Sequence, residues 1–182
     1  VVTVFDRYWM IEGGKPSVVA QWYGHIDMDI LAWKSAQIAK YYNNALLVIE
    51  SNTLETHDRE RNVDGDQSHY ILNEIKEVYP NLYARKQSAE QIAEGAPLKY
   101  GFHTNVLTKS WIIDNLIAFV DDKLWDEPDA EMYRELRNYE RRDDGTMGNI
   151  VGKDNHDDVL MSTAIALWVC MNDMKAPEWK RV

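Results

Sequence analysis

A short, wholly apolar run constrains the fold of this chain more than any other feature. It reads ALLVI at residues 45–49, follows Asn43-Asn44 and stops abruptly at Glu50. A run of this length is typical of a strand buried on both faces, as in the middle of a mixed or parallel sheet. Because helical patterns flank it, the run predicts an α/β fold rather than a sandwich or a bundle.

Turn signals and hydrophobic periodicity predict the other elements. The Glu12-Gly13-Gly14-Lys15 turn separates two strand-like segments and predicts a hairpin. The order of elements describes one α/β domain over residues 1–182. We expect strands at 1–11, 16–26, 45–49 and 82–86, a small hairpin at 139–150, helices at 27–42, 67–79, 108–124, 128–136 and 156–174, a loop at 53–66 and a surface excursion at 87–98.

Composition supports a folded domain in a reducing compartment. The chain is 45% hydrophobic, which provides enough apolar surface for a core. Its single cysteine, Cys170, excludes an internal disulfide and favours a cytoplasmic location. No apolar run approaches the ~18 residues that a membrane span needs, and no signal peptide is evident. We expect the core to include Trp22 and Tyr23, and the apolar face of the first helix to comprise Ile30, Leu31, Trp33, Ile38 and Tyr42.

The net charge of −10 argues against strong autonomous binding of nucleic acid, which usually requires a basic surface. Divalent metal ions can supply the positive charge at an acidic nuclease site. A separate domain or partner can also hold the DNA. The acidic balance therefore weakens the case for DNA binding by this chain alone and leaves nuclease chemistry open.

Carboxylates stand at two positions where metal sites often form. Glu50 follows the predicted buried strand, and ligands bind outside the carboxyl ends of strands in open α/β sheets. Asp157 and Asp158 open the last predicted helix. Hard cations such as Mg²⁺ prefer carboxylate oxygens. The alternative remains open that Glu50 only marks the strand end and that the aspartates only cap the helix and interact with its dipole.

Other chemistries lack their motifs. The histidines and the cysteine do not show zinc-ligand spacing. The chain contains neither a Walker A sequence nor a Gly-x-Ser-x-Gly elbow, which argues against an ATPase and a serine hydrolase.

Four segments, in this order, carry a resemblance to a known family. They are the hairpin at 1–26 with VAQW at 19–22, YYNNALLVIESN at 41–52, GFHTN at 101–105 with Thr108-Lys109, and HDDVLM at 156–161. Together they resemble the C-terminal nuclease domain of phage terminase large subunits. The resemblance implies an RNase H-like fold, with a mixed central sheet and helices on both faces.

The resemblance also implies site residues and partners. Glu50 and one or both of Asp157 and Asp158 correspond to metal ligands for two Mg²⁺ or Mn²⁺ ions. The DNA contacts would be Lys109, Thr104, Asn105 and His156. The substrate would be concatemeric double-stranded DNA. The partners would be an ATPase domain in the same full-length chain, the small terminase subunit and the portal, in the cytoplasm of a bacterium that carries the phage or prophage.

One part of the family pattern has no counterpart here. The family's first catalytic Asp lies on a strand that would precede Val1, and the ATPase motor precedes that strand. The resemblance therefore implies that the first strand is missing and that the chain, with two of three acidic positions, binds metal weakly and cleaves poorly. Two alternatives stay open: another RNase H-like nuclease, such as a resolvase or a transposase core, and a docking module of the packaging motor that has lost cleavage.

Overall fold

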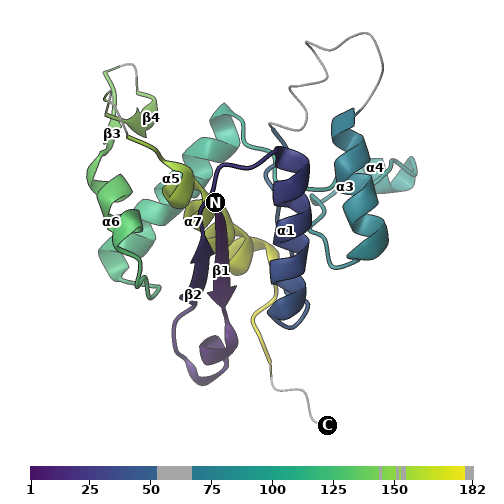
Figure 1. The fold of residues 1–182 in the computed structure, drawn as a ribbon, viewed down its shortest axis with the longest axis horizontal. Coiled ribbons are helices and arrows are strands. Elements are labelled where there is room, and N and C mark those ends of the chain that lie inside the picture. The colour runs from purple at the N-terminus through teal and green to yellow at the C-terminus, as the bar shows by residue number, and fades with distance from the viewer. Residues whose placement is uncertain (53–66, 144, 151, 153–154, 179–182) are drawn as a thin grey trace. The chain divides into compact units, whose positions relative to one another are not determined.

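The structure is a computed structural model that describes residues 1–52, 67–143, 145–150, 152 and 155–178 (Figure 1). The expected loop at 53–66 lies outside these residues. The chain divides into two compact units: the α7 unit, Val1–Gly24 with Val106–Val182, and the α3 unit, His25–Asn105. Within the described ranges, none of the helices has the length and apolar character needed to cross a membrane.

The α7 unit begins with the predicted hairpin. Strands β1 (Val2–Asp6) and β2 (Ser17–Trp22) pair antiparallel, so the hairpin is confirmed. The first strand is shorter than predicted. The Asp6 carboxylate accepts a hydrogen bond from the backbone N–H of Tyr8 at 2.7 Å, and residues Tyr8–Glu12 form a 3₁₀ helix, η1. This local side-chain bond offers the backbone an alternative to the ladder, and the strand ends there.

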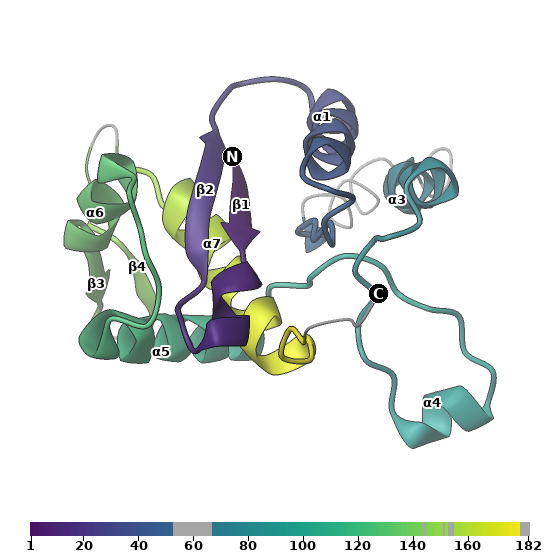
Figure 2. The ribbon, with the colours of Figure 1, turned by 90° about the horizontal axis from the view of Figure 1, so that it is seen from below.

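Helix α7 (Asp158–Trp168) packs against the other elements of its unit and is continued by a π-helical turn, η2 (Val169–Asp173). Its neighbours are β1, α5 (Val106–Asp122) and α6 (Ala130–Arg137) (Figure 2). Most of its side chains are buried, and that of Leu160 is fully covered. A helix that is apolar on most faces is typical of such a central position. The predicted last helix is therefore confirmed.

A second small hairpin follows α6. Strands β3 (Tyr139–Arg141) and β4 (Met147–Asn149) pair antiparallel, as the sequence predicts. They lie beside α5 and α6 (Figure 2). The protein is thus a mixed α/β structure, and that part of the fold prediction is confirmed. The strands of the described residues form two-stranded sheets, β1–β2 and β3–β4, with isolated bridges elsewhere.

The α3 unit contains α1 (Met28–Tyr41), α3 (Gln67–Val78) and the short α4 (Ala89–Ala93). Helix α4 stands apart from the other two in Figure 2, as expected for a surface excursion. The unit has its own core, in which a stripe of small residues from α1 meets larger side chains. The buried members are Ala32, Ala36, Ala39, Leu47, Ile75, Tyr79 and Leu82.

The predicted burial of large residues near α1 is partly wrong. Ile30 and Trp33 are 52% and 37% exposed, and Tyr23, expected in the core, is 44% exposed. The face that packs is the alanine face of α1, because small side chains let the backbone of the helix approach its neighbours closely. Periodicity alone favoured the larger residues.

The apolar run at 45–49 is held by isolated bridges, and the prediction of a regular strand is wrong. Leu47 bridges Leu82 in parallel, and Glu50 bridges Phe102 in parallel. Further along, Ala84 bridges Tyr100 antiparallel, where the sequence predicts a strand at 82–86. The run is nevertheless partly buried, as its composition requires.

Candidate functional site

Asp157 and Asp158 stand at the start of α7, as predicted. Asp157 occupies the N-cap position, but its carboxylate makes no capping hydrogen bond. Only its backbone carbonyl takes part, accepting from the N–H of Met161 at 2.8 Å. Asp158 is exposed in the first turn. Capping by the Asp157 side chain therefore does not explain the acidic pair, although both charges interact favourably with the helix dipole.

The cap of α7 comes from Glu135 on α6. The Glu135 carboxylate accepts from the backbone N–H of Leu160 at 2.7 Å and is only 3% exposed. Burial raises the pKa of Glu135 to about 7; the bond from Leu160 opposes this rise, and the nearby charge of Asp158 adds to it. Because Glu135 satisfies a terminal amide of α7, the carboxylates of the aspartates stay available for other partners.

The sequence interpretation missed Glu135. A signal existed, because Met132 and Glu135 are three residues apart on one face of α6, and Met132 is fully buried. An acid on the apolar face of a short helix requires a partner for its carboxylate. The partner itself lies 25 residues away in the chain.

Lys109, a predicted DNA contact, lies beside Asp157. Its ammonium group is 3.9 Å from the Asp157 carboxylate, and the two side chains are 34% and 31% exposed. The same ammonium group lies 5.9 Å from the centre of the Tyr139 ring. Helix α5, the start of α7 and strand β3 thus bring one cation, one carboxylate and one phenol together.

Tyr139 has an uncommon environment. Burial raises its pKa to about 12, and the negative charge of Asp157 adds to the rise. Its hydroxyl oxygen is buried without a hydrogen-bond partner among the described residues, and so is the side-chain oxygen of Asn149, its cross-strand partner. The protein therefore covers this hydroxyl, and burial favours its neutral form.

Glu50 is exposed at the end of the apolar run, and its backbone neighbours hold it in place. The N–H of Ser51 donates to the carbonyl of Phe102 at 2.8 Å, and the N–H of Phe102 donates to the carbonyl of Ile49 at 2.7 Å. Ser51 is fully buried. This ladder fixes the backbone on both sides of Glu50 and leaves its carboxylate accessible to solvent.

Arg85 and Gly101 complete the support of Glu50. The Arg85 guanidinium donates to the Ser51 hydroxyl at 2.6 Å and to the carbonyl of Gly101 at 3.0 Å. Gly101 has a φ of 78°, and a Cβ there would lie 2.8 Å from the carbonyl oxygen of Ile49. The close approach of the two segments therefore requires glycine.

Thr104 and Asn105 lie at the end of the α3 unit. The N–H of Thr104 donates to the Asn52 side chain at 2.6 Å, and the Asn52 amide donates back to the Thr104 carbonyl. The Thr104 hydroxyl oxygen is buried without a hydrogen-bond partner in the described part of the chain, and Asn105 is exposed. Segments 50–52 and 101–104 therefore form one local structure.

The candidate acids offer oxygen donors of the kind that a hard divalent cation takes. Glu50 belongs to the α3 unit, whereas Asp157 and Asp158 belong to the α7 unit. Carboxylates are the ligands that Mg²⁺ and Mn²⁺ prefer. Within the described ranges, no group of three or more His, Cys, Asp or Glu residues is arranged to hold a metal ion. The two-metal site thus stays a prediction.

The chain was compared with protein-family models, with curated proteins and with solved structures. None of the three comparisons found a match. The resemblance to terminases rests on the four sequence segments, of which 41–52 and 101–105 are in contact through Ser51, Asn52, Phe102 and Thr104.

Proposed function

We propose that this chain is the RNase H-like nuclease domain of a phage-type terminase large subunit, a Mg²⁺- or Mn²⁺-dependent endonuclease that cleaves concatemeric double-stranded DNA during genome packaging. One observation carries the proposal: the segments that resemble the terminase nuclease domain contact one another in pairs. The segment that contains Glu50 is hydrogen-bonded to the Gly101–Thr104 segment, and Lys109 pairs with Asp157. The proposed partners are an ATPase domain of the same full-length protein, the small terminase subunit and the portal.

The proposed site combines acidic and donor groups. Glu50, Asp157 and Asp158 would hold two metal ions, whose charge stabilises the phosphate and lowers the pKa of a bound water. Lys109 would hold the Asp157 carboxylate in position and offer its charge to a backbone phosphate.

Calorimetric titration with Mn²⁺ tests the site on the whole chain. We expect Glu50→Gln, Asp157→Asn and Asp158→Asn to weaken Mn²⁺ binding, with at least one aspartate variant and Glu50→Gln each costing about tenfold or more. Asp121→Asn, which removes an exposed acid at the end of α5, is the matched control and should bind as wild type does. Nicking of supercoiled plasmid in Mn²⁺ should follow the same order. Equal binding and nicking by all variants would show that the assignment is wrong.

A second candidate function is a module that docks the motor or the portal without cleaving DNA. The net charge of −10 favours it, because a strongly acidic surface repels DNA and suits a basic protein surface. The same titration with Mn²⁺ distinguishes this docking function from the nuclease function. Absence of both Mn²⁺ binding and nicking would favour docking over cleavage.

A further inference from the structure

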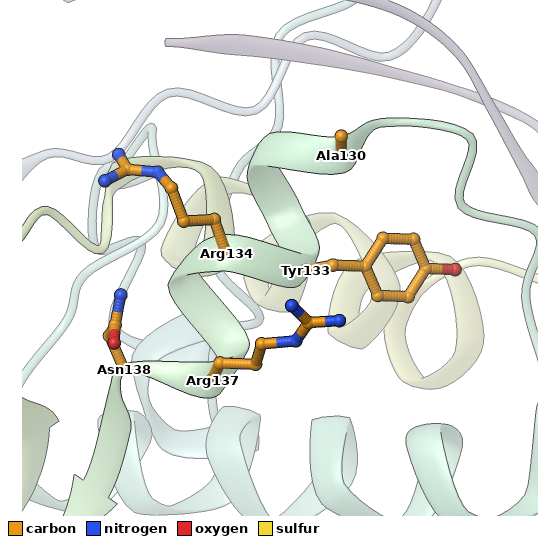
Figure 3. A pocket seen from close by; sticks show the side chains of 5 residues that line it. All are labelled: Ala130, Tyr133, Arg134, Arg137 and Asn138. Atoms are coloured by element: carbon orange, nitrogen blue, oxygen red, sulfur yellow. The ribbon is translucent and has the colours of Figure 1, made fainter.

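A basic hollow lies on the exposed face of α6. Its volume is about 360 Å³, and the lining residues that the structure describes lie on one face of α6 and at the residue after it. These residues recur at three- and four-residue spacing, so they share one side of the helix. They are Ala130, Tyr133, Arg134, Arg137 and Asn138 (Figure 3).

Two guanidinium groups border this hollow. In Figure 3, Tyr133 and Arg137 extend to one side of the face, and Arg134 and Asn138 extend to the other. The hydroxyl of Tyr133 donates to the carbonyl of Glu127 at 3.1 Å, which restrains its ring. Ala130 contributes only a methyl group and so leaves room between the longer side chains. Among the described residues, the lining of the hollow therefore combines small, aromatic and cationic side chains.

The two arginines differ in what they contact. Arg134 forms a forked ion pair with Glu131, with Nε to carboxylate distances of 3.0 and 2.9 Å. Arg137 is exposed, and the described part of the chain provides no hydrogen-bond or ion-pair partner for its guanidinium. Both arginines complement the dipole at the end of α6, but that role needs only their charge. Interaction with the dipole does not explain why Arg137 lies at the edge of a hollow without a hydrogen-bond partner among the described residues.

The hollow is connected to the acidic pair through α6 itself. Glu135, on the buried face of this helix, binds the N–H of Leu160 in the first turns of α7. On the other side, His156 lies near enough to Glu131 for its charge to lower the pKa of that carboxyl, after the larger effect of Arg134. Helix α6 therefore contacts the start of α7 through its buried face and carries the hollow on its exposed face.

We propose that this hollow binds a phosphate group of a DNA strand, with Arg137 as the principal contact. A guanidinium with five donors and a planar shape matches phosphate oxygens. The inference thus deepens the proposed nuclease function and rests on it for the identity of the strand.

The test measures binding of a fluorescently labelled 20-base-pair duplex by anisotropy, in EDTA, so that metal plays no part. We expect Arg137→Gln to weaken binding roughly tenfold at low salt, because it removes a charge-assisted contact. The slope of log affinity against log salt should fall by about 0.9, the value for one lost phosphate contact. Arg137→Lys, which keeps the charge, should bind more tightly than Arg137→Gln. Lys15→Ala, in the turn between β1 and β2, removes one charge outside the hollow and should change affinity less than about twofold.

The proposal is overturned if Arg137→Gln binds the duplex as wild type does, or if Lys15→Ala weakens binding equally. It is also overturned if phosphate binds the hollow but the duplex does not. In that case inorganic phosphate, added as a competitor, shifts the NMR signals of the hollow in an Arg137-dependent way, while duplex affinity is the same with and without Arg137. Failure of the nuclease function has a different signature. In that case Glu50→Gln and the aspartate variants leave Mn²⁺ binding unchanged, while a loss of duplex affinity in Arg137→Gln still supports the hollow.

Discussion

The two units support their candidate acids by different means. In the α7 unit, Asp157 and Asp158 stand on a helix whose body is buried and whose first amides are bound by the side chain of Glu135. In the α3 unit, Glu50 stands on an irregular segment that is fixed by backbone bonds to Phe102. Side-chain burial supports the first site, and backbone geometry supports the second.

This difference identifies the changes to which each site is sensitive. A site built on a buried helix should respond most to the truncation of core side chains. A site built on a close approach of two backbones should respond most to an added Cβ. Four measurements on the purified chain test this contrast, and they are described from the largest expected effect to the smallest.

Leu160→Ala should destabilise the α7 unit by about 3 to 5 kcal/mol, because it removes a fully buried side chain and leaves a cavity. Urea unfolding followed by tryptophan fluorescence measures the change. Leu107→Ala on α5 is the control, because the Leu107 side chain is 57% exposed. It should cost less than about 1 kcal/mol. Similar losses for the two variants would contradict the central position of α7.

Gly101→Ala should cost about 2 to 4 kcal/mol, because it combines an unfavourable positive φ with a clash against the carbonyl of Ile49. Gly95→Ala is a close match, since Gly95 has a φ of 68° and open space around its Cα. It should lose only about 1 kcal/mol. The difference between the two, measured by urea unfolding, isolates the close approach that supports Glu50. Equal losses would mean that this approach contributes nothing.

Glu135 should make the stability of metal-free protein depend on pH. Its pKa is raised from 4.5 to about 7 in the folded state, so the unfolded chain releases this proton first as pH rises. The contribution of Glu135 is therefore fully present below pH 4.5 and is lost as pH rises toward 7. The loss is about 3 kcal/mol.

The variant Glu135→Gln, which keeps a carbonyl oxygen for the N–H of Leu160, lacks this titration. Relative to wild type, its free energy of unfolding should rise between pH 4.5 and 8 when both proteins are measured in EDTA. A constant difference across this range would refute the raised pKa. Groups that titrate equally in both proteins cancel in the comparison.

Lys109→Met should have the smallest effect on stability. The ion pair with Asp157 is 3.9 Å long and about one-third exposed, so its loss should cost about 0.5 kcal/mol or less. If Lys109 contacts DNA as proposed, Lys109→Met should cost clearly more free energy in duplex binding than in unfolding. A stability loss above about 2 kcal/mol would instead identify Lys109 as a structural residue.

Several elements could be predicted from local signals. The hairpin around Gly13, the end of α3 before Pro80 and the turn at Gly145 all follow from residues that act on their own backbone. The extension of the first strand to Ile11 could not be excluded in this way, because its aromatic residues suit a strand as well as the 3₁₀ helix that forms.

Burial and pairing were harder to predict. The alanine face of α1 packs although Ile30 and Trp33 have the stronger apolar signal. The run at 45–49 is only partly buried, although burial on both faces was predicted, and it makes bridges in place of a ladder. Both outcomes depend on the size and backbone path of segments that are distant in the chain. The periodicity of one segment carries no information about these neighbours.

The acidic positions themselves follow from the sequence alone. Glu50 after an apolar run and the Asp157–Asp158 pair before an apolar helix are local patterns, and so are the ends of most helices. Tertiary structure decided what surrounds these acids. It placed Lys109 beside Asp157 and made Glu135, 25 residues from Leu160, the cap of α7. A terminal amide must be satisfied, but any acceptor that folding brings near can do so, and only the packing of α6 on α7 selects Glu135.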